Sequence, residues 1–443
     1  MQRYSHVKKQ DKKIYEALEG EEKRQAEGLE LIPSENIVSL AVREAMGSCL
    51  TNKYSEGYPH ARYYGGNEII DVVEDIARDR AKKLFGVPHA NVQPYSGSPA
   101  NLAVYLATCK PGDTIMGHLL TAGGHLTHGW KASATSMFYN AVQYGVKPDG
   151  YLDLKEIARL AKKHKPKLIW VGATAYVREF PFKELAKIAD SVGAYLAADI
   201  AHIAGLVVAG AHKSPVPYAH IVTTTTHKTL RGPRGGMILV TKKGLKKDPE
   251  LAAKVDRAIF PNLQGGPHNH TTAGIAVALQ EAATPAFRAY GKQIVKNAKA
   301  LAESLKKRGV ELVSNGTENH MILVKCGTGR GAILEIALDI IGLTTNKNTI
   351  PDEPSSPFYP SGIRIGTPSM TTRGMKEHEM GIIGNLIADV MALTKDEKMP
   401  EKNERKVYLG NLKKRLHKNA QLTKLRKEVR TLCKKFPIPD SFV

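Results

Sequence analysis

Short apolar runs alternate with longer helical patterns along residues 113–202. Residues 168–172 form a short apolar run, and residues 195–199 form another that ends in an acid, Asp199; such runs are typical of strands that are buried on both faces. Between them, residues 182–192 carry apolar positions at helical spacing, and Gly193 closes this helix. The strand–helix–strand rhythm predicts an α/β fold with a large, mostly parallel mixed sheet and helices on both of its faces.

Helical patterns are also found nearer the start of the chain. Residues 11–31 predict an amphipathic N-terminal helix. A second helix follows Asn67, which can cap it, and ends near Gly86. The apolar stripe of this second helix is predicted to consist of Ile69, Val72, Val73 and Ile76.

The pattern changes near residue 285, where a separate, smaller α/β unit begins. Helical spacing over 294–307 and 333–341 brackets a strand at 321–324. We therefore predict three parts of the chain. They are an N-terminal helical arm (1–30), a large domain (31–284), and a smaller C-terminal domain with a basic helical tail (285–443).

The composition is that of an ordinary soluble globular protein. The 443 residues are 42% hydrophobic and 24% charged, and no apolar run reaches the length of a membrane span. The first thirteen residues lack the hydrophobic core of a signal peptide. The four cysteines lie far apart without a CxxC pair, so neither a zinc site nor a disulfide framework is expected. These features favour a reducing cytoplasm.

Much of the formal net charge of +21 lies near the C-terminus. Residues 401–435 contain thirteen Lys and Arg against three Glu. A basic face can bind nucleic acid, but more often it is a solvated surface, and no RRM, KH or zinc-finger pattern accompanies it here. Nucleic-acid binding is therefore disfavoured. A docked basic helix is predicted instead from the helical spacing of Leu422, Leu425, Val429 and Leu432.

The segment 222–236 carries the most specific chemical signal. It reads as a threonine-rich strand that ends at His227 and Lys228, followed by a glycine-rich turn and a second strand from Met237. A lysine at such a rim either ends the strand and points to water, or is desolvated so that its amine can attack a carbonyl. Asp199, 29 positions earlier, ends another predicted strand. Pyridoxal phosphate enzymes require such a lysine together with an acid that faces the pyridine nitrogen.

Two further features fit a phosphorylated aromatic cofactor. Ser96, Gly97 and Ser98 precede a predicted helix, where free N–H groups and the helix dipole attract an anion; a plain serine cap is the alternative. Residues 117–129 contain three histidines without zinc-ligand spacing or a nearby acid, so no metal site is expected. One of the three, His118, His125 or His128, could instead lie flat on the cofactor ring.

Two motifs in the C-terminal part have competing interpretations. Residues 327–332 match the GxGxxG/A dinucleotide pattern, but the second strand ending in an acid is missing, so nicotinamide binding is not expected. Arg364 lies in a short predicted strand, where it could pair with a protein acid or bind a substrate carboxylate.

Nearer the N-terminus, residues 52–66 are rich in tyrosine and glycine and form either a surface loop or a loop that reaches a site or a partner subunit.

Taken together, the motifs NKYSEGYP, RYYGG, ANVQPYSGS, GGHLTHG, TTTTHKTLRGPRGG, QGGP, NKN and SGIRIGTP resemble those of serine hydroxymethyltransferase, from about Ile14 to Pro439. The resemblance implies a fold-type I, aminotransferase-like enzyme that depends on pyridoxal 5'-phosphate. It also implies a homodimer, or a tetramer, with shared active sites. The implied reaction is the reversible transfer of the hydroxymethyl carbon of serine to tetrahydrofolate, giving glycine and 5,10-methylenetetrahydrofolate. This is a transferase of one-carbon, serine and glycine metabolism.

The resemblance also assigns roles to individual residues. The catalytic group is expected to comprise Lys228, which binds the cofactor covalently, with Glu56, Tyr54, Tyr64, His227 and Thr225. The other implied cofactor-binding residues are Ser96, Gly97, Ser98, His125, Thr174, Asp199, His202, Gly265 and Gly266. The implied substrate-binding residues are Ser34, Tyr54, Glu56, Tyr64 and Arg364, and folate is expected to contact Leu120, Gly124, Leu126 and Asn346. Tyr54, Glu56, Gly265 and Gly266 would be donated across the dimer interface.

Several positions depart from the usual pattern of the family without removing a chemical role; they are Pro33, Tyr95, Pro99, Thr174 and Arg231. A threonine aldolase, which uses no pterin, is the rival enzyme class. It would not need the NKN and QGGP segments or Glu56, all of which are present. Retro-aldol cleavage of β-hydroxy amino acids is nevertheless expected as a side activity. A modified pterin remains an alternative carrier to tetrahydrofolate.

Overall fold

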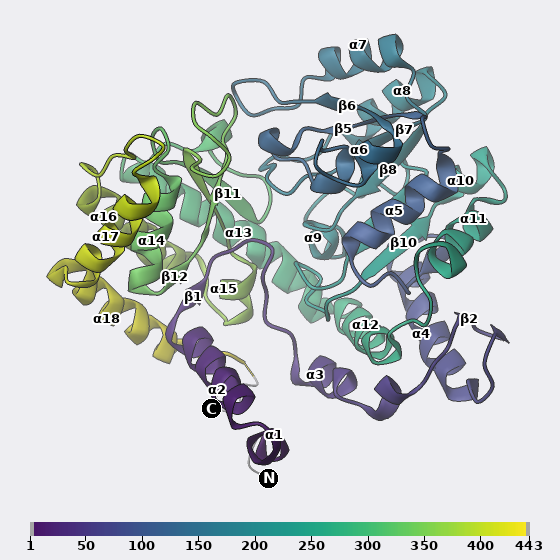
Figure 1. Ribbon diagram of the computed structural model, residues 1–443, viewed down its shortest axis with the longest axis horizontal. Helices are drawn as coiled ribbons and strands as arrows, with labels where there is room; N and C mark the ends of the chain where they lie inside the picture. Colours follow the sequence, from purple (N-terminus) through teal and green to yellow (C-terminus); the bar gives the residue numbers. More distant parts are fainter. Residues whose placement is uncertain (1–3, 440–443) are drawn as a thin grey trace.

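The computed structural model describes residues 4–439. Residues 1–3 and 440–443, which form the ends of the predicted arm and of the predicted C-terminal domain, lie outside the described residues. Figure 1 shows two packed parts, with the long helix α13 (Pro285–Lys307) running between them. None of the helices within residues 4–439 is long and apolar enough to cross a bilayer.

A seven-stranded sheet forms the centre of the larger part. Five neighbouring strands are parallel, and β10 alone runs antiparallel to both of its neighbours, which confirms the predicted mostly parallel, mixed sheet. In sheet order the strands are β4 (His89–Asn91), β10 (Gly236–Val240), β9 (Ile221–Thr225), β8 (Tyr195–Asp199), β7 (Leu168–Val171), β5 (Thr114–His118) and β6 (Asn140–Tyr144).

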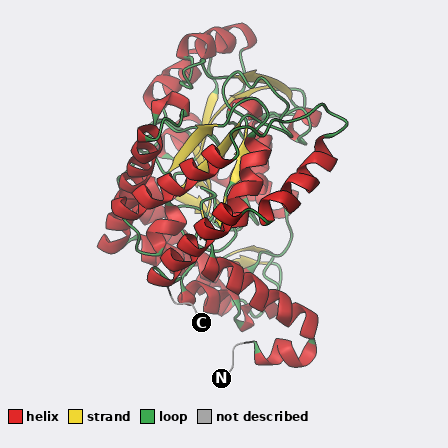
Figure 2. Cartoon of the chain, turned by 90° about the vertical axis from the view of Figure 1, so that its left-hand side faces the viewer, coloured by secondary structure: helices red, strands yellow, loops and turns green. Residues whose placement is uncertain are grey.

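Alternate residues of these strands enter two different apolar cores, because successive side chains point to opposite faces. Ile169 and Leu196 belong to the core under α7 and α8, whereas Trp170 and Ala197 pack with α5 and α11. Figure 2 shows helices on both sides of the strands. The helices of this part are α3 (Leu40–Met46), α4 (Glu68–Phe85), α5 (Gly97–Thr108), α6 (Thr135–Phe138), α7 (Leu154–His164), α8 (Phe182–Ser191), α9 (Ala204–Val208), α10 (Lys242–Lys247), α11 (Leu251–Arg257) and α12 (Asn269–Ala282).

Short elements connect these helices and strands. A two-stranded hairpin, β2 and β3, follows α3 and lies near α4 (Figure 1). The bounds of the short elements are η1 (Cys49–Asn52), β2 (Gly57–Tyr58), β3 (Ala61–Arg62), η2 (Leu120–Ala122), η3 (Leu126–His128), the π-helical η4 (Ala258–Leu263) and η5 (Val313–Asn315).

The smaller part has its own core around an antiparallel sheet in the order β11-β14-β13. The start of the chain contributes to it, since β1 pairs with β12 and Leu29 and Leu31 are fully buried there. The predicted division at residues 30 and 284 stays a prediction. The elements of this part are β1 (Leu29–Glu30), β11 (Met321–Lys325), α14 (Gly331–Ile341), β12 (Leu343–Thr344), β13 (Asn346–Asn348), β14 (Gly362–Gly366), α15 (Pro368–Thr372) and α16 (Glu377–Leu393).

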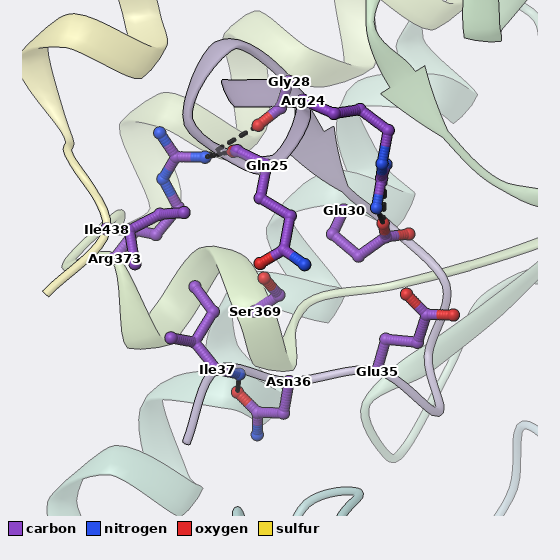
Figure 3. A pocket seen from close by; sticks show the side chains of 10 residues that line it. All are labelled: Arg24, Gln25, Gly28, Glu30, Glu35, Asn36, Ile37, Ser369, Arg373 and Ile438. Carbon is purple, nitrogen blue, oxygen red and sulfur yellow. Dashed lines mark hydrogen bonds and ion pairs between the residues drawn. The ribbon is translucent and has the colours of Figure 1, made fainter. Parts of the chain in front are cut away.

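The basic tail is docked on the smaller part. It forms α17 (Arg405–His417) and α18 (Ala420–Lys435), and all four predicted apolar positions of α18 are buried in the core of the smaller part. Arg373 joins the segment after α2 to the segment after α18, because it donates hydrogen bonds to the carbonyl oxygen of Phe436 (2.7 Å) and to that of Gly28 (2.7 Å), the second of which is drawn in Figure 3. The prediction of a docked helix is therefore confirmed, although two helices share the segment.

Two helix predictions need correction. The predicted helix 11–31 corresponds to α2 (Lys12–Glu27), which ends early because Gly28 is extended and residues 29–30 form β1. A separate short helix, α1 (Ser5–Gln10), precedes it, and the extended Asp11 ends α1 and caps α2. In α4 the predicted apolar stripe does not face the core: Ile69, Val72 and Ile76 are 70%, 53% and 39% exposed, and Val73 is half-buried. Asn67 precedes α4, but its side chain donates to the carbonyl of Tyr64 and does not cap the helix. The buried face of α4 consists of Ile70, Asp71, Glu74, Ala77, Ala81 and Phe85.

Candidate active site

Lys228 lies three residues beyond the end of β9, at the carboxyl edge of the parallel strands. Burial lowers the pKa of its ammonium to about 8; the charge of Asp199 opposes this shift, and the charges of Arg364 and Arg234 add to it. A lysine that simply pointed to water would keep its ordinary pKa. The amine is therefore held where a useful fraction is unprotonated and nucleophilic near neutral pH.

Asp199 ends β8, the neighbour of β9 in the sheet. Its Oδ2 accepts a hydrogen bond from Asn101 Nδ2 (2.9 Å) and lies 3.3 Å from His128 Nε2, while Oδ1 accepts from the Ala201 N–H (3.0 Å). Burial raises the pKa of this carboxyl, but the hydrogen bond and charge of His128, with smaller contributions from His125 and Lys228, hold it below its ordinary value. Asp199 is thus an ionised carboxylate that can face a cationic ring nitrogen.

Two of the three histidines of residues 117–129, His125 and His128, lie against this carboxylate, whereas His118 stacks on Tyr144. His128 stacks on Trp170 with ring centroids 5.2 Å apart, and burial lowers the pKa of His125 to about 4. The potential ligand atoms of His125, His128 and Asp199 all lie within 4.8 Å of one another. The sequence analysis found no acid near these histidines along the chain, but the fold brings Asp199 next to two of them, so that argument is wrong. Asp199 Oδ2, however, is already engaged by Asn101 and His128.

Arg364 brings the smaller part of the molecule to the same place. It lies on β14, donates from Nε to Asn346 Oδ1 (3.0 Å), and donates from Nη1 to the carbonyl oxygen of Thr174. Burial lowers the pKa of its guanidinium to about 10, and the charge of Glu35 opposes this shift. Arg364 remains cationic at neutral pH, so it is a suitable partner for a substrate carboxylate. Ser34 lies in the turn just before Glu35.

The predicted folate segment lies beside Arg364. Thr174 Oγ1 donates to the carbonyl of Gly124 (2.8 Å), and Thr349, which follows β13, donates to the carbonyl of Thr121 (2.8 Å). Residues 119–126 are thereby joined to the strand that carries Asn346. The side chain of Leu126 is 50% exposed, so this segment offers an apolar surface to a ligand. His202 lies further inside, with Nδ1 3.3 Å from Nε2 of His320.

The serine segment 96–98 fits an anion. Ser96 is the N-cap residue of the twelve-residue α5, and its side chain makes no capping hydrogen bond. A Cβ at Gly97 would lie 2.8 Å from Thr225 Cγ2, so the backbone approaches β9 as closely as glycine permits. His227 Nδ1 is buried without a hydrogen-bond partner within residues 4–439, and burial lowers the pKa of this imidazole to about 3. A phosphate near these groups would satisfy the orphaned nitrogen.

The other predicted residues form a second group, on a cavity of about 620 Å³. The cavity is lined by Tyr54, Glu56, Gly265 and Gly266. The ring of Tyr64 packs edge-to-face on that of Tyr54, with the ring centroids 5.7 Å apart. Among the described residues, Lys228, Asp199 and Arg364 are not part of this lining. The chain therefore carries two sets of predicted site residues, and the second set lines a cavity to which these three residues do not contribute.

Comparison with known proteins agrees with this geometry. The family model for serine hydroxymethyltransferase matches residues 7–387. The chain is also 52% identical, over 433 residues, to "Serine hydroxymethyltransferase" of Sorangium cellulosum; the match covers 97% of this chain and 95% of the relative. The chain belongs to the serine hydroxymethyltransferase family.

Membership of the serine hydroxymethyltransferase family confirms the predicted fold type I and the predicted one-carbon transferase. It also confirms the expected cofactor, pyridoxal phosphate, and the co-substrate tetrahydrofolate. The chain's own residues fit that cofactor. A desolvated amine, a carboxylate, a cationic guanidinium and a helix N-terminus without a side-chain cap lie at the carboxyl edge of one sheet or beside it.

Sequence reasoning missed residues that hold the site residues in place. Asn101, on α5, orients Asp199, yet nothing in its local pattern marks it as polar core. Arg62 is only 3% exposed and pairs with Asp71 and Glu74 at 2.8 Å each. It also donates to the carbonyls of Ser55 and Gly57, which flank Glu56 (2.9 Å each). The signal that could have revealed Arg62 was the pair of acids on α4, three positions apart.

Proposed function

We propose that the surroundings of Lys228 are the site at which this chain transfers the hydroxymethyl carbon between serine and tetrahydrofolate. The observation that carries the proposal is the desolvation of the Lys228 amine at the carboxyl end of β9, near the charges of Asp199 and Arg364, which shift its pKa in opposite directions. Pyridoxal phosphate, when bound, supplies an electron sink for bond breaking at the amino-acid α-carbon.

In this proposal each charge of the bound molecules meets a complementary group. Asp199 faces the ring nitrogen and keeps it protonated, while His125 covers the ring and His202 and Thr174 lie near its oxygen substituent. The phosphate is bound by Ser96, Gly97, Ser98 and His227, beside Thr225. Arg364 and Ser34 bind the substrate carboxylate, and Leu120, Gly124, Leu126 and Asn346 contact folate.

The second group of residues completes the site of a neighbouring copy. We infer a homodimer, or a tetramer built from two dimers, in which Tyr54, Glu56, Tyr64, Gly265 and Gly266 face the partner's Lys228 region. Glu56 moves a proton during carbon transfer. The exposed apolar stripe of α4 supports this assembly, because large exposed apolar residues at regular spacing mark protein interfaces (Ile69, Val72 and Ile76).

Two finer predictions belong to the same proposal. Retro-aldol cleavage of β-hydroxy amino acids is expected as a side activity, because it needs Lys228, Asp199 and Arg364 but no pterin. A cytoplasmic location is supported by the four free thiols, of which Cys326 and Cys433 are buried.

A mixing experiment tests the catalytic role of Lys228 and the shared site together. Lys228→Ala and Glu56→Ala should each abolish tetrahydrofolate-dependent formation of glycine from serine. When the two variants are unfolded and refolded together, random pairing restores one intact site in each mixed dimer, or about a quarter of the wild-type activity. No recovery, while mixed dimers are detected by mass, would contradict shared sites. Full activity of Lys228→Ala would contradict the proposal as a whole.

A further inference from the structure

The backbone carbonyl of Lys228 is held by two donors. The Arg231 N–H donates to it at 3.1 Å, closing a turn in which Arg231 has a left-handed φ of 61°. The second donor is Nδ2 of Asn36, at 3.0 Å, from a segment that is 192 positions away in the sequence. Together these bonds fix the peptide plane that follows Lys228, and with it the direction in which the side chain leaves the backbone.

The amide of Asn36 is itself fixed by further partners. Its Nδ2 also donates to the Tyr290 hydroxyl at 2.8 Å. Its Oδ1 accepts from the Ile37 N–H (2.9 Å), drawn in Figure 3, and from Thr372 Oγ1 (2.7 Å). The amide has one favourable orientation, because a flip would turn its NH2 group toward the Ile37 N–H and its oxygen toward the Lys228 carbonyl.

The partners of Asn36 come from elements that also position the substrate side of the site. Tyr290 lies on α13, and Thr372 lies on α15, which directly follows the strand of Arg364. Thr372 and Tyr290 are themselves linked at 3.0 Å, and the Arg231 guanidinium lies 5.1 Å from the Tyr290 ring centre. One amide thus joins the backbone of Lys228 to the helix behind β14.

We propose that Asn36 is a positioning residue for Lys228, which aims the lysine amine by holding its backbone carbonyl against α13 and α15. The inference rests on the proposed function of Lys228. It assigns to the Asn36 side chain a task distinct from that of Ser34 and Glu35, its neighbours in the same loop. Arg231 takes part in the same arrangement. Its N–H supplies the second hydrogen bond to the Lys228 carbonyl, and its guanidinium packs on the ring of Tyr290, whose hydroxyl orients Asn36.

Two measurements test the role of Asn36, and neither is enzyme activity. The first is the dissociation constant of pyridoxal phosphate. The second is the pH midpoint for acylation of Lys228 in the cofactor-free protein, followed by peptide mass spectrometry. Loss of one such hydrogen bond should weaken pyridoxal phosphate binding about 3- to 10-fold in Asn36→Ala. The pH midpoint of Lys228 should rise from about 8 toward its ordinary value, because a misaimed amine is less desolvated.

Asn297→Ala is the matched control. Asn297 is a buried amide on α13, the helix that carries Tyr290, and it donates to Thr371 Oγ1 (2.8 Å) and to the Met375 carbonyl (2.9 Å). It should lower the melting temperature about as much as Asn36→Ala but leave both measurements at wild-type values. If Asn36→Ala does not fold, Tyr290→Phe, which keeps the ring and removes one partner of Nδ2, should give a smaller change in the same direction.

Each result decides between the alternatives. The positioning role would be overturned if Asn36→Ala and Asn297→Ala changed the two measurements equally. It would also be overturned if neither Asn36→Ala nor Tyr290→Phe changed the acylation midpoint of Lys228. Both results would leave the proposed function intact. A wild-type chain that forms no covalent adduct of pyridoxal phosphate at Lys228 would instead overturn the proposed function, and this inference with it.

Discussion

Replacing Lys228 by methionine should stabilise the cofactor-free protein near neutral pH. Burial lowers the pKa of Lys228 from 10.5 to about 8. The unfolded chain therefore binds more protons than the folded one between these two values, and folding becomes more favourable as the pH rises through this window. At pH 7 the amine is still mostly protonated and buried, so the wild type bears nearly the full cost of burying a charge.

The size of this cost follows from the two pKa values. One pKa unit corresponds to about 1.36 kcal/mol, so the difference amounts to about 3 kcal/mol between low and high pH. About 2.5 kcal/mol of it falls between pH 7 and pH 10. Methionine has a similar length and no charge, so its contribution does not change with pH. The stability difference between Lys228→Met and the wild type should therefore shrink by about 2.5 kcal/mol across this range.

Urea unfolding of both cofactor-free proteins at pH 7, 8, 9 and 10 measures this difference. Taking the difference between the two proteins cancels the titration of other lysines, tyrosines and cysteines. Lys131→Met, at an exposed position, serves as the control for the loss of a lysine side chain. A stability difference for Lys228→Met that stays constant with pH would refute the conclusion that the amine is desolvated.

Three further predictions address the surroundings of Lys228. Asp199→Asn removes the charge that raises the pKa of Lys228, so the acylation midpoint of Lys228 should fall below that of the wild type; an unchanged or higher midpoint would contradict the contact. Arg62→Ala removes the arginine that pairs with two buried carboxylates, so the free energy of unfolding measured in urea should fall by about 3–5 kcal/mol and turnover that depends on Glu56 should be lost. A change below about 1 kcal/mol would contradict the role of Arg62 in holding the segment around Glu56. Val72→Asp places a charge on the exposed apolar stripe of α4 and should give monomers in sedimentation equilibrium with unchanged circular dichroism; an intact dimer would rule out this face as the interface.

The central sheet was predictable because its strands are buried on both faces. Residues 195–198 form a continuous apolar run that ends at Asp199, and β8 has the predicted bounds Tyr195–Asp199 in the structure. The strand ends then place Asp199 and Lys228 at one edge, since parallel neighbours end on the same side. For such elements the local pattern and the tertiary environment agree.

The stripe of α4 shows where local pattern fails. A helical period says that Ile69, Val72 and Ile76 share one face, but it does not say which surface covers that face. In the single chain this face is exposed, and the opposite face buries Asp71 and Glu74 around Arg62. An ion-paired helix face cannot be distinguished from a solvated one by sequence periodicity, because both look polar.

Long-range polar contacts were the other part that could not be predicted. Asn36 and Lys228 are separated by 192 positions, and Asn101 and Asp199 by 98. Nothing in the local sequence states that either amide will meet its partner. The cofactor-facing residues themselves were reached through family motifs, and their individual roles remain predictions.

The central claim is that Lys228 binds pyridoxal phosphate and that the resulting site serves glycine and tetrahydrofolate together. The most direct test is the visible absorption spectrum of the purified protein, first with pyridoxal phosphate, then with glycine, and finally with tetrahydrofolate. We predict a yellow protein, loss of the yellow band in Lys228→Ala, and a new red-shifted band only when both ligands are present. A spectrum with glycine that ignores tetrahydrofolate would indicate an aldolase instead, and a colourless protein that cannot be reconstituted with pyridoxal phosphate would contradict the claim.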